Sequence, residues 1–216
     1  MPAIIFDMDG VIVDSTATHT EAWVVYLRNL GISADNLTAR MLGKHNSELV
    51  RDLFGTRPLT EDDVFAHGAA KEALYRDMIR PVLREKLVPG IREFLTRHKN
   101  EPMAVATNAE PANVRFVLEN AGLAPYFQAV VDGSQVARPK PHPDVFLKAA
   151  ELLGHAPEDC VIFEDSLTGI QAARASGARV VGLTTSLREL PSVDLAIGDF
   201  FNSRLEPWLQ ELPASR

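Results

Sequence analysis

The chain has only one cysteine in 216 residues, Cys160, so no disulfide can form within it. This cysteine precedes the apolar segment 161–163, and we expect a buried thiol that serves packing. No stretch approaches the roughly 18 consecutive apolar residues of a membrane-spanning helix, and the first residues lack the basic and apolar regions of a signal peptide. These absences predict a cytoplasmic protein with no membrane partner.

Positive charge is also scarce. Lys and Arg number 22 against 29 Asp and Glu, a net charge of −7, which leaves no basic surface for nucleic acid. An anionic substrate would have to be held by local positive charge. Hydrophobic residues make up 46% of the chain, enough for a full core. We expect a monomer or a small homo-oligomer.

The first motif is a short apolar segment that ends in acid. Residues 4–14 read IIFDMDGVIVD. If residues 4–6 form a buried strand, the chain leaving it can direct Asp7 at a ligand, Gly10 permits a tight turn, and Asp9 can reach the same ligand. Two such acids suit phosphoryl transfer, one as nucleophile and one moving the proton. Asp-x-Asp also occurs in turns, where the carboxylates cap backbone N–H groups.

Three later apolar segments also end in polar residues: 103–106 in Thr107-Asn108, 130–131 in Asp132-Gly133, and 161–163 in Glu164-Asp165. The segments between them, for example 114–118 and 145–153, have helical periodicity. This β-α-β-α alternation predicts an α/β fold with a doubly wound, Rossmann-like parallel sheet. Because parallel strands end at the same edge, we expect the polar strand ends to converge there.

One long segment does not follow this alternation. Residues 15–88 contain no convincing strand and several stretches with one apolar helical face. We therefore predict a catalytic core of residues 1–14 and 89–216, interrupted by a helical cap domain of residues 15–88. A helical unit on two connections beside the acid loop could act as a lid.

Taken together, these segments resemble a known family. DMDGV at 7–11, Thr107-Asn108, RPKPHPD at 138–144 and EDS at 164–166 look like the four motifs of the haloacid dehalogenase-like phosphotransferases, in the family's order. The helical insert resembles the cap of the subgroup that contains β-phosphoglucomutase and many small-metabolite phosphatases. The resemblance implies Mg²⁺ and an aspartyl-phosphate intermediate.

A cluster of acids supports the metal expectation. Carboxylates ~4 Å apart repel by roughly 4 kcal/mol at an effective dielectric near 20, and a divalent cation removes that conflict. Oxygen ligands without histidine or cysteine suit Mg²⁺. The resemblance assigns the carboxylates of Asp7 and Asp165 and the backbone carbonyl of Asp9 as ligands, with Glu164 orienting a bound water. An exposed Glu164 that caps the following helix is the alternative.

The resemblance also assigns the catalytic roles. Asp7 is the expected nucleophile and Asp9 the general acid and base, while Thr107 and Lys140 neutralise the phosphoryl oxygens. From the residues alone, Lys140 can also be a solvated surface charge, and Arg138 lies close enough in sequence to compete for its role. Thr107 and Asn108 can equally cap the helix that opens near residue 111.

The insert is expected to select the leaving group. Its first helix resembles that of the mutase, with His19 on the family pattern. Lys71, further along the insert, also matches that pattern. These matches favour sugar phosphates. The mutase arginine that holds a distal phosphate is replaced by Asn46, and its serine-lysine pair by residues 109–110. Two cationic phosphate contacts are therefore absent, although Lys44 or Arg51 could compensate. The substrate-binding residues that we predict are Asn108, His19, Lys71, Lys44 and Asn46.

We therefore predict a Mg²⁺-dependent phosphatase that acts on a small phosphorylated metabolite, with a sugar phosphate as the expected substrate. The alternative is a β-phosphoglucomutase-like intramolecular phosphotransferase, which would use the same two acids of the first loop. A haloacid dehalogenase without metal is disfavoured because its chemistry needs neither Asp9 nor Asp165. A non-catalytic binding protein is disfavoured because Asp7, Asp9, Lys140 and Asp165 are all present.

Overall fold

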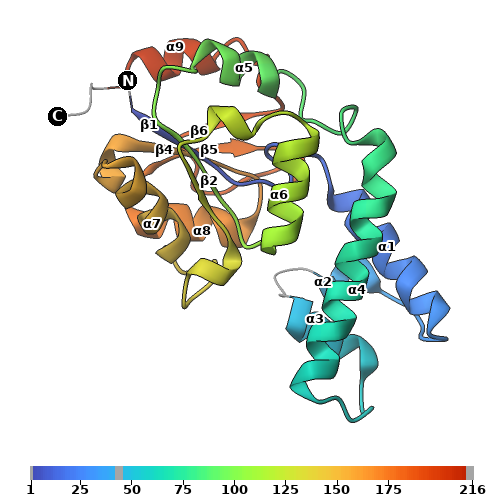
Figure 1. Cartoon of the computed structure of the whole chain (residues 1–216). Coiled ribbons are helices and arrows are strands. Elements are labelled where there is room, and N and C mark those ends of the chain that lie inside the picture. The colour runs from blue at the N-terminus through green and yellow to red at the C-terminus, as the bar shows by residue number, and fades with distance from the viewer. Residues whose placement is uncertain (1, 42–45, 213–216) are drawn as a thin grey trace. The chain divides into compact units, whose positions relative to one another are not determined.

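The computed structural model describes residues 2–41 and 46–212 (Figure 1). It divides into two compact units, one of Met1–Asp14 with Leu83–Arg216 and one of Ser15–Val82. The helical unit is shorter than the expected 15–88, because residues after Val82 pair with the core. Val13 forms an antiparallel bridge with Leu87, and the N–H of Val88 donates to the carbonyl of Ile12 at 3.0 Å.

The core unit is built on one parallel sheet, which confirms the predicted α/β fold. Its strands lie in the order β3-β2-β1-β4-β5-β6. The strands are β1 (Ala3–Phe6), β2 (Met103–Ala106), β3 (Ala129–Val131), β4 (Cys160–Glu164), β5 (Arg179–Leu183) and β6 (Leu195–Ile197). The strands β5 and β6 were not predicted from the sequence.

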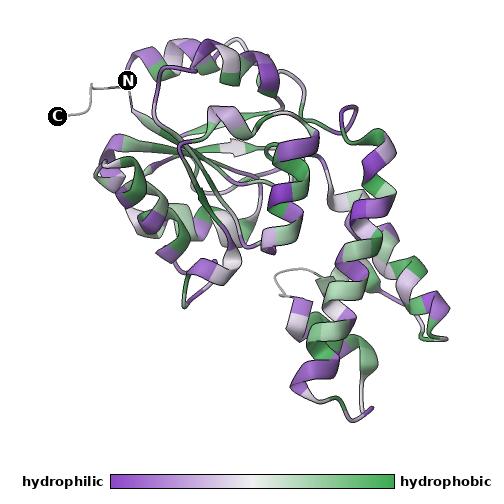
Figure 2. Cartoon of the chain, in the orientation of Figure 1, coloured by the Kyte–Doolittle hydropathy of each residue, from purple (hydrophilic) through white to green (hydrophobic). Residues whose placement is uncertain are grey.

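Helices cover both faces of the sheet. The core helices are α5 (Ile91–Arg97), α6 (Pro111–Asn120), α7 (Asp144–Leu153), α8 (Leu167–Ser176) and α9 (Leu205–Gln210). Figure 1 shows α7 and α8 on one face and α5 and α9 on the other. Strands buried on both faces need apolar residues at every position, and β1, β2 and β4 are buried along their whole length. Apolar colouring accordingly follows the strands in Figure 2.

The two faces of the sheet are packed differently. Small and branched side chains such as Ile5, Ile162 and Ala173 fill the face toward α7 and α8. The opposite face holds an aromatic cluster in which the rings of Phe6 and Phe163 stack at 5.1 Å and Phe94 of α5 packs edge-on. Cys160 is buried at the start of β4, and burial raises the pKa of its thiol to about 12, as expected for a packing residue.

The regular elements in the described residues of the inserted unit are all helical. It consists of α1 (Thr16–Asn29), α2 (Leu37–Met41), α3 (Asn46–Phe54), α4 (Glu61–Ile79) and a 3-10 turn, Arg80–Val82. Helix α4 begins with a capping box, in which Thr60 and Asp63 exchange hydrogen bonds. Trp23 is buried in the core of this unit beside Leu27 and Val50. Among the described residues of the whole chain, none of the helices has the length and hydropathy to cross a membrane.

Candidate active site

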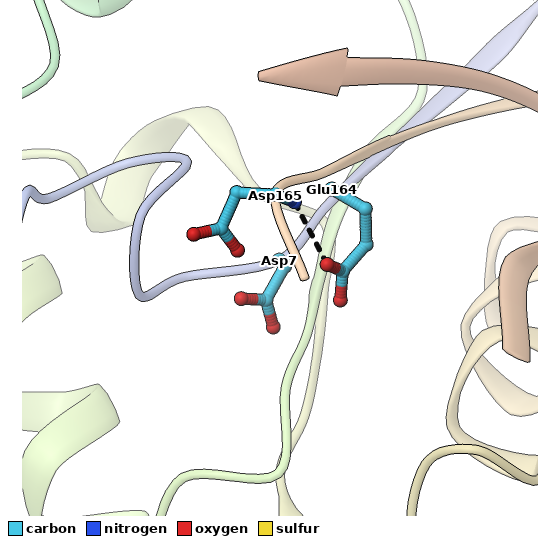
Figure 3. Close-up of side chains that lie close together, drawn as sticks. All are labelled: Asp7, Glu164 and Asp165. Atoms are coloured by element: carbon cyan, nitrogen blue, oxygen red, sulfur yellow. Dashed lines mark hydrogen bonds between the residues drawn. The ribbon is translucent and has the colours of Figure 1, made fainter. Parts of the chain in front are cut away.

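The site lies at the carboxyl end of the sheet, where β1 separates β2 from β4. The order of strands along the chain reverses at this point, and open α/β sheets bind ligands there. Asp7 follows β1 directly, and Glu164 and Asp165 lie at the end of β4. The three buried carboxylates offer oxygens that all lie within 4.8 Å of one another. Figure 3 shows them gathered where the chain leaves the two strands.

Lys140 supplies the positive charge within this cluster. Its Nζ donates to Asp7 Oδ1 at 2.6 Å and to Glu164 Oε1 at 2.7 Å, and only 5% of the residue is exposed. The interpretation of Lys140 as a solvated surface charge is therefore wrong. Arg138, the competing cation, is exposed and forms an ion pair with Asp144.

The segment that carries Lys140 is held by the loop after β2. The backbone N–H of Lys140 donates to Asn108 Oδ1 at 3.2 Å. Thr107 is buried at the end of β2, and its Oγ1 accepts from the N–H of Ala109 at 3.2 Å. The N-cap of α6 is Glu110, so neither predicted residue is the cap of that helix. Both stand at the carboxyl edge of the sheet, next to β1, the strand that Asp7 follows.

Glu164 is fully engaged by its neighbours. Its Oε1 accepts a hydrogen bond from Lys140. Its Oε2 accepts from the N–H group of Asp165, the bond drawn in Figure 3, and from the N–H group and the hydroxyl of Ser166. Only 1% of Glu164 is exposed, so the alternative interpretation of Glu164 as an exposed helix cap is wrong. Ser166 caps α8 instead, by accepting from the N–H of Gly169.

Two glycines make room for the carboxylates. A Cβ on Gly169 would lie 1.7 Å from Glu164 Oε1, and a Cβ on Gly10 would lie 1.8 Å from Asp165 Oδ2. Gly10 also has a positive φ of 79°, a conformation that other residues rarely adopt. A side chain at either position would displace an acid of the cluster.

Two hydroxyls that the sequence analysis missed also contact the cluster. Ser186 Oγ donates to Asp165 Oδ2, and Thr185 Oγ1 donates to the carbonyl of Gly10 at 2.6 Å. Both follow β5, whose existence the sequence analysis did not predict. The available signal was the same as for the other strand ends, an apolar segment followed by polar residues.

Burial and mutual repulsion dominate the electrostatics. Burial, with the charges of Glu164 and Asp9, raises the pKa of Asp7 to about 7, against the opposing effect of Lys140. Burial and the neighbouring carboxylates also raise the pKa of Asp165. Burial alone would lower the pKa of Lys140, but the carboxylates of Asp7 and Glu164 raise it above its ordinary value. Lys140 faces three carboxylates, so the site keeps an excess of negative charge that a divalent ion would neutralise. The oxygen donors of the site fit Mg²⁺.

Asp9 lies on the same loop as Asp7. It is half-buried and forms a backbone bridge with Val13, and the N–H of Gly10 donates to the Val13 carbonyl at 2.7 Å. The loop is thus a tight turn closed by backbone hydrogen bonds, with Asp7 at its start.

Three of the four residues predicted in the insert form a second polar cluster, within the helical unit. Lys71 Nζ lies 2.9 Å from His19 Nδ1 and donates to Glu72 Oε1 at 2.7 Å, and Asn46 Nδ2 donates to the same oxygen at 2.6 Å. The ring of His19 stacks on Tyr75, with centroids 3.7 Å apart. Lys44 lies outside the described residues.

Glu72 is the unpredicted member of this second cluster. Its carboxylate is buried, which opposes ionisation, but Lys71, His19 and Asn46 together lower its pKa. The charge of Lys71 is therefore balanced inside the helical unit by an ionised acid. Adjacent residues on a helix seldom face each other, so the sequence carried little signal for this pair.

Comparison with known proteins decides the family. The sequence model of the haloacid dehalogenase-like hydrolase family matches residues 1–177 of the chain. This chain belongs to the haloacid dehalogenase-like hydrolases. The predicted family is thereby confirmed.

Two relatives of this hydrolase are enzymes that act on sugar phosphates. It is 37% identical over 180 residues to the fructose-1-phosphate phosphatase YqaB of Escherichia coli K12, a match that covers 82% of this chain and 94% of that protein. It is 32% identical over 190 residues to the β-phosphoglucomutase of Bacillus subtilis 168, covering 85% of this chain and 83% of the mutase.

A solved structure agrees with the fold. The β-phosphoglucomutase of Clostridium difficile superposes with a TM-score of 0.84 at 26% identity, covering 97% of the hydrolase and 96% of that chain. With relatives of both kinds, the haloacid dehalogenase-like hydrolase described here is an enzyme of the phosphatase and phosphotransferase type, as predicted.

Proposed function

We propose that this enzyme is a Mg²⁺-dependent phosphatase that hydrolyses a small sugar phosphate through an aspartyl-phosphate on Asp7. The observation that carries the proposal is the position of Asp7. Its carboxylate lies at the end of β1, is held by Lys140 at 2.6 Å, and lies beside Asp165. A cytoplasmic location and a monomeric or small homo-oligomeric state remain predictions.

The proposed metal site uses the carboxylates of Asp7 and Asp165 with the backbone carbonyl of Asp9. Glu164 is not proposed as a direct ligand, because both of its oxygens already accept hydrogen bonds. When bound, Mg²⁺ would offset the negative charge of the acids and of the phosphoryl oxygens. The pKa of Asp7 is about 7 without metal, so loading the site would also favour the ionised nucleophile.

In the first step, a carboxylate oxygen of Asp7 attacks phosphorus and the bond from phosphorus to the sugar oxygen breaks. Asp9 donates a proton to that leaving oxygen. In the second step, Asp9 takes a proton from water, the water oxygen attacks phosphorus, and the bond to Asp7 breaks. Phosphate leaves and both acids regain their starting states.

Lys140 and Thr107 are proposed to stabilise the charge that develops on the phosphoryl oxygens. Lys140 is rigidly placed, with its ammonium between two carboxylates and 4.5 Å from the ring centre of Phe146. A donor held in position before reaction loses little energy in reorganisation. Glu164 contributes indirectly, because it fixes the position of the Lys140 ammonium.

The polar cluster of the helical unit is proposed to bind the leaving group. His19 and Asn46 are half-buried and carry donors and acceptors suited to sugar hydroxyls. The buried carboxylate of Glu72 neutralises Lys71, so this pair offers no net positive charge to a second phosphate. This favours substrates with a single phosphate, and hence hydrolysis over the bisphosphate chemistry of a mutase.

The alternative is intramolecular transfer, as in β-phosphoglucomutase. The specific observation in its favour is the B. subtilis mutase, which is 32% identical over most of both chains. The alternative would use the same Asp7 and Asp9, but a sugar hydroxyl would take the place of water as the acceptor.

One assay distinguishes the two. Purified enzyme with Mg²⁺ is incubated with β-glucose 1-phosphate and a trace of the bisphosphate, and glucose 6-phosphate and free phosphate are followed together. Fructose 1-phosphate and a panel of other phosphate esters are tested in parallel. We expect free phosphate as the main product, no activity in excess chelator, and no turnover by Asp7→Asn. Accumulation of glucose 6-phosphate without free phosphate would favour the mutase, and turnover by Asp7→Asn would remove Asp7 as the nucleophile.

A further inference from the structure

The chain after β5 adds a third set of contacts to the acid site. Thr185 Oγ1 donates to the carbonyl of Gly10 at 2.6 Å and lies 3.4 Å from Asp165 Oδ2, and Ser186 Oγ donates to that same oxygen. These two hydroxyls connect the acid loop after β1 with the acid that follows β4. Neither residue has a role in the steps proposed above.

The two hydroxyls are carried by an anchored segment. The N–H of Thr184 donates to the carbonyl of Ile197 at 2.9 Å, which continues the pairing of β5 with β6. Further along, Leu190 packs so closely on β5 that a Cβ on Gly182 would lie 2.6 Å from its Cδ1. The segment is therefore fixed to the sheet before and after the two hydroxyls.

The groups that they contact have reason to need support. Asp165 is buried next to two other acids, so repulsion favours rotation of its carboxylate away from the cluster. Gly10 has no side chain with which to anchor the acid loop. Partners that hold a metal-ligating carboxylate typically change metal affinity by about 10- to 100-fold when they are removed.

We propose that Thr185 and Ser186 are positioning residues that set the affinity of the acid site for its divalent cation. Ser186 holds the Asp165 carboxylate by one oxygen, and Thr185 holds the Gly10 carbonyl and thus the loop that carries Asp7. The inference rests on the proposed function for its cation. It assigns a role to a strand end for which we have proposed no catalytic step.

The test measures the Mg²⁺ affinity of the metal-stripped full chain from the dependence of its Tm on Mg²⁺ concentration. We expect Ser186→Ala and Thr185→Val each to weaken Mg²⁺ binding by about 10- to 100-fold. Ser186→Thr, which keeps the hydroxyl, should bind nearly as the wild type does. Ser203→Ala, at an exposed serine of the same unit, is the matched control and should not change binding.

A second measurement separates positioning from a general loss of structure. At saturating Mg²⁺, phosphate release by Ser186→Ala should return to within about threefold of the wild type, because the residue acts only through metal affinity. Unchanged Mg²⁺ affinity in both variants would overturn the inference, as would a lower kcat at saturation with an unaltered Mg²⁺ dependence. If Thr185→Val fails to fold, Thr185→Ser should restore binding. A wild type that binds no Mg²⁺ would instead overturn the metal proposal and this inference together.

Discussion

The buried carboxyl group of Asp7 should make the stability of the metal-free enzyme fall as pH rises. Asp7 is only 7% exposed, and its pKa is raised from 3.8 to about 7 in the folded protein. The folded state therefore binds this proton more tightly than the unfolded state does. The resulting stability is fully present below pH 3.8 and is lost as pH rises through about 7. A difference of about 3 in pKa corresponds to about 4 kcal/mol.

The assay is urea unfolding in excess chelator at intervals from pH 4 to pH 8, for wild type and Asp7→Asn. Other titrating groups affect both proteins, so the informative quantity is the difference between their unfolding free energies. We expect the wild type to lose about 4 kcal/mol relative to Asp7→Asn over this range. Glu85→Gln, at an exposed acid of the same unit, should follow the wild type.

Mg²⁺ supplies a second arm of the same experiment. At pH 8, saturating Mg²⁺ should restore much of the stability lost by the wild type, because the cation replaces the proton as the neutralising charge. It should do less for Asp7→Asn, which lacks one proposed ligand. Parallel pH curves for the two proteins would refute the reasoning, because Asp7 could then not be the buried acid that titrates in this window.

Two further substitutions test how the two polar clusters are built. Gly169→Ala should lower stability by roughly 1–3 kcal/mol and also impair phosphate release, because the new Cβ would lie 1.7 Å from a Glu164 oxygen and force that side chain away from Lys140. Glu72→Gln should raise kcat/KM for a sugar bisphosphate relative to the monophosphate severalfold, because it would leave the positive charge of Lys71 unbalanced and able to attract a second phosphate.

Each of these substitutions has a matched control. A Cβ on Gly68 in α4 would make only an ordinary contact, 3.8 Å from the Cβ of Asn46, so Gly68→Ala should stabilise the chain by about 0.5–1 kcal/mol. Equal effects of the two glycine substitutions would contradict the steric argument. Glu21→Gln, at an exposed position of α1, should leave the substrate ratio unchanged. An unchanged ratio in Glu72→Gln itself would remove that carboxylate from substrate selection.

The strand ends were the most predictable part of this protein. Apolar segments before Asp7, Thr107 and Glu164, with helical periodicity between them, predict parallel strands with crossovers, and parallel strands place their carboxyl ends at one edge. The same rule brings Asp7 and Asp165 together without any knowledge of side-chain positions. The final strands β5 and β6 lay outside the prediction, and the hydroxyls that follow β5 were missed with them.

Local sequence patterns thus determined the α/β core, the helical insert and the identity of the acids, because periodicity and strand-end chemistry act over a few residues. The tertiary structure decided which side chains pair across long separations. Lys140 joins Asp7 and Glu164, Ser186 holds Asp165, and Glu72 gathers Lys71 and Asn46. Such pairs depend on burial, on the room left by glycines and on the direction of each side chain, which only the packed chain specifies.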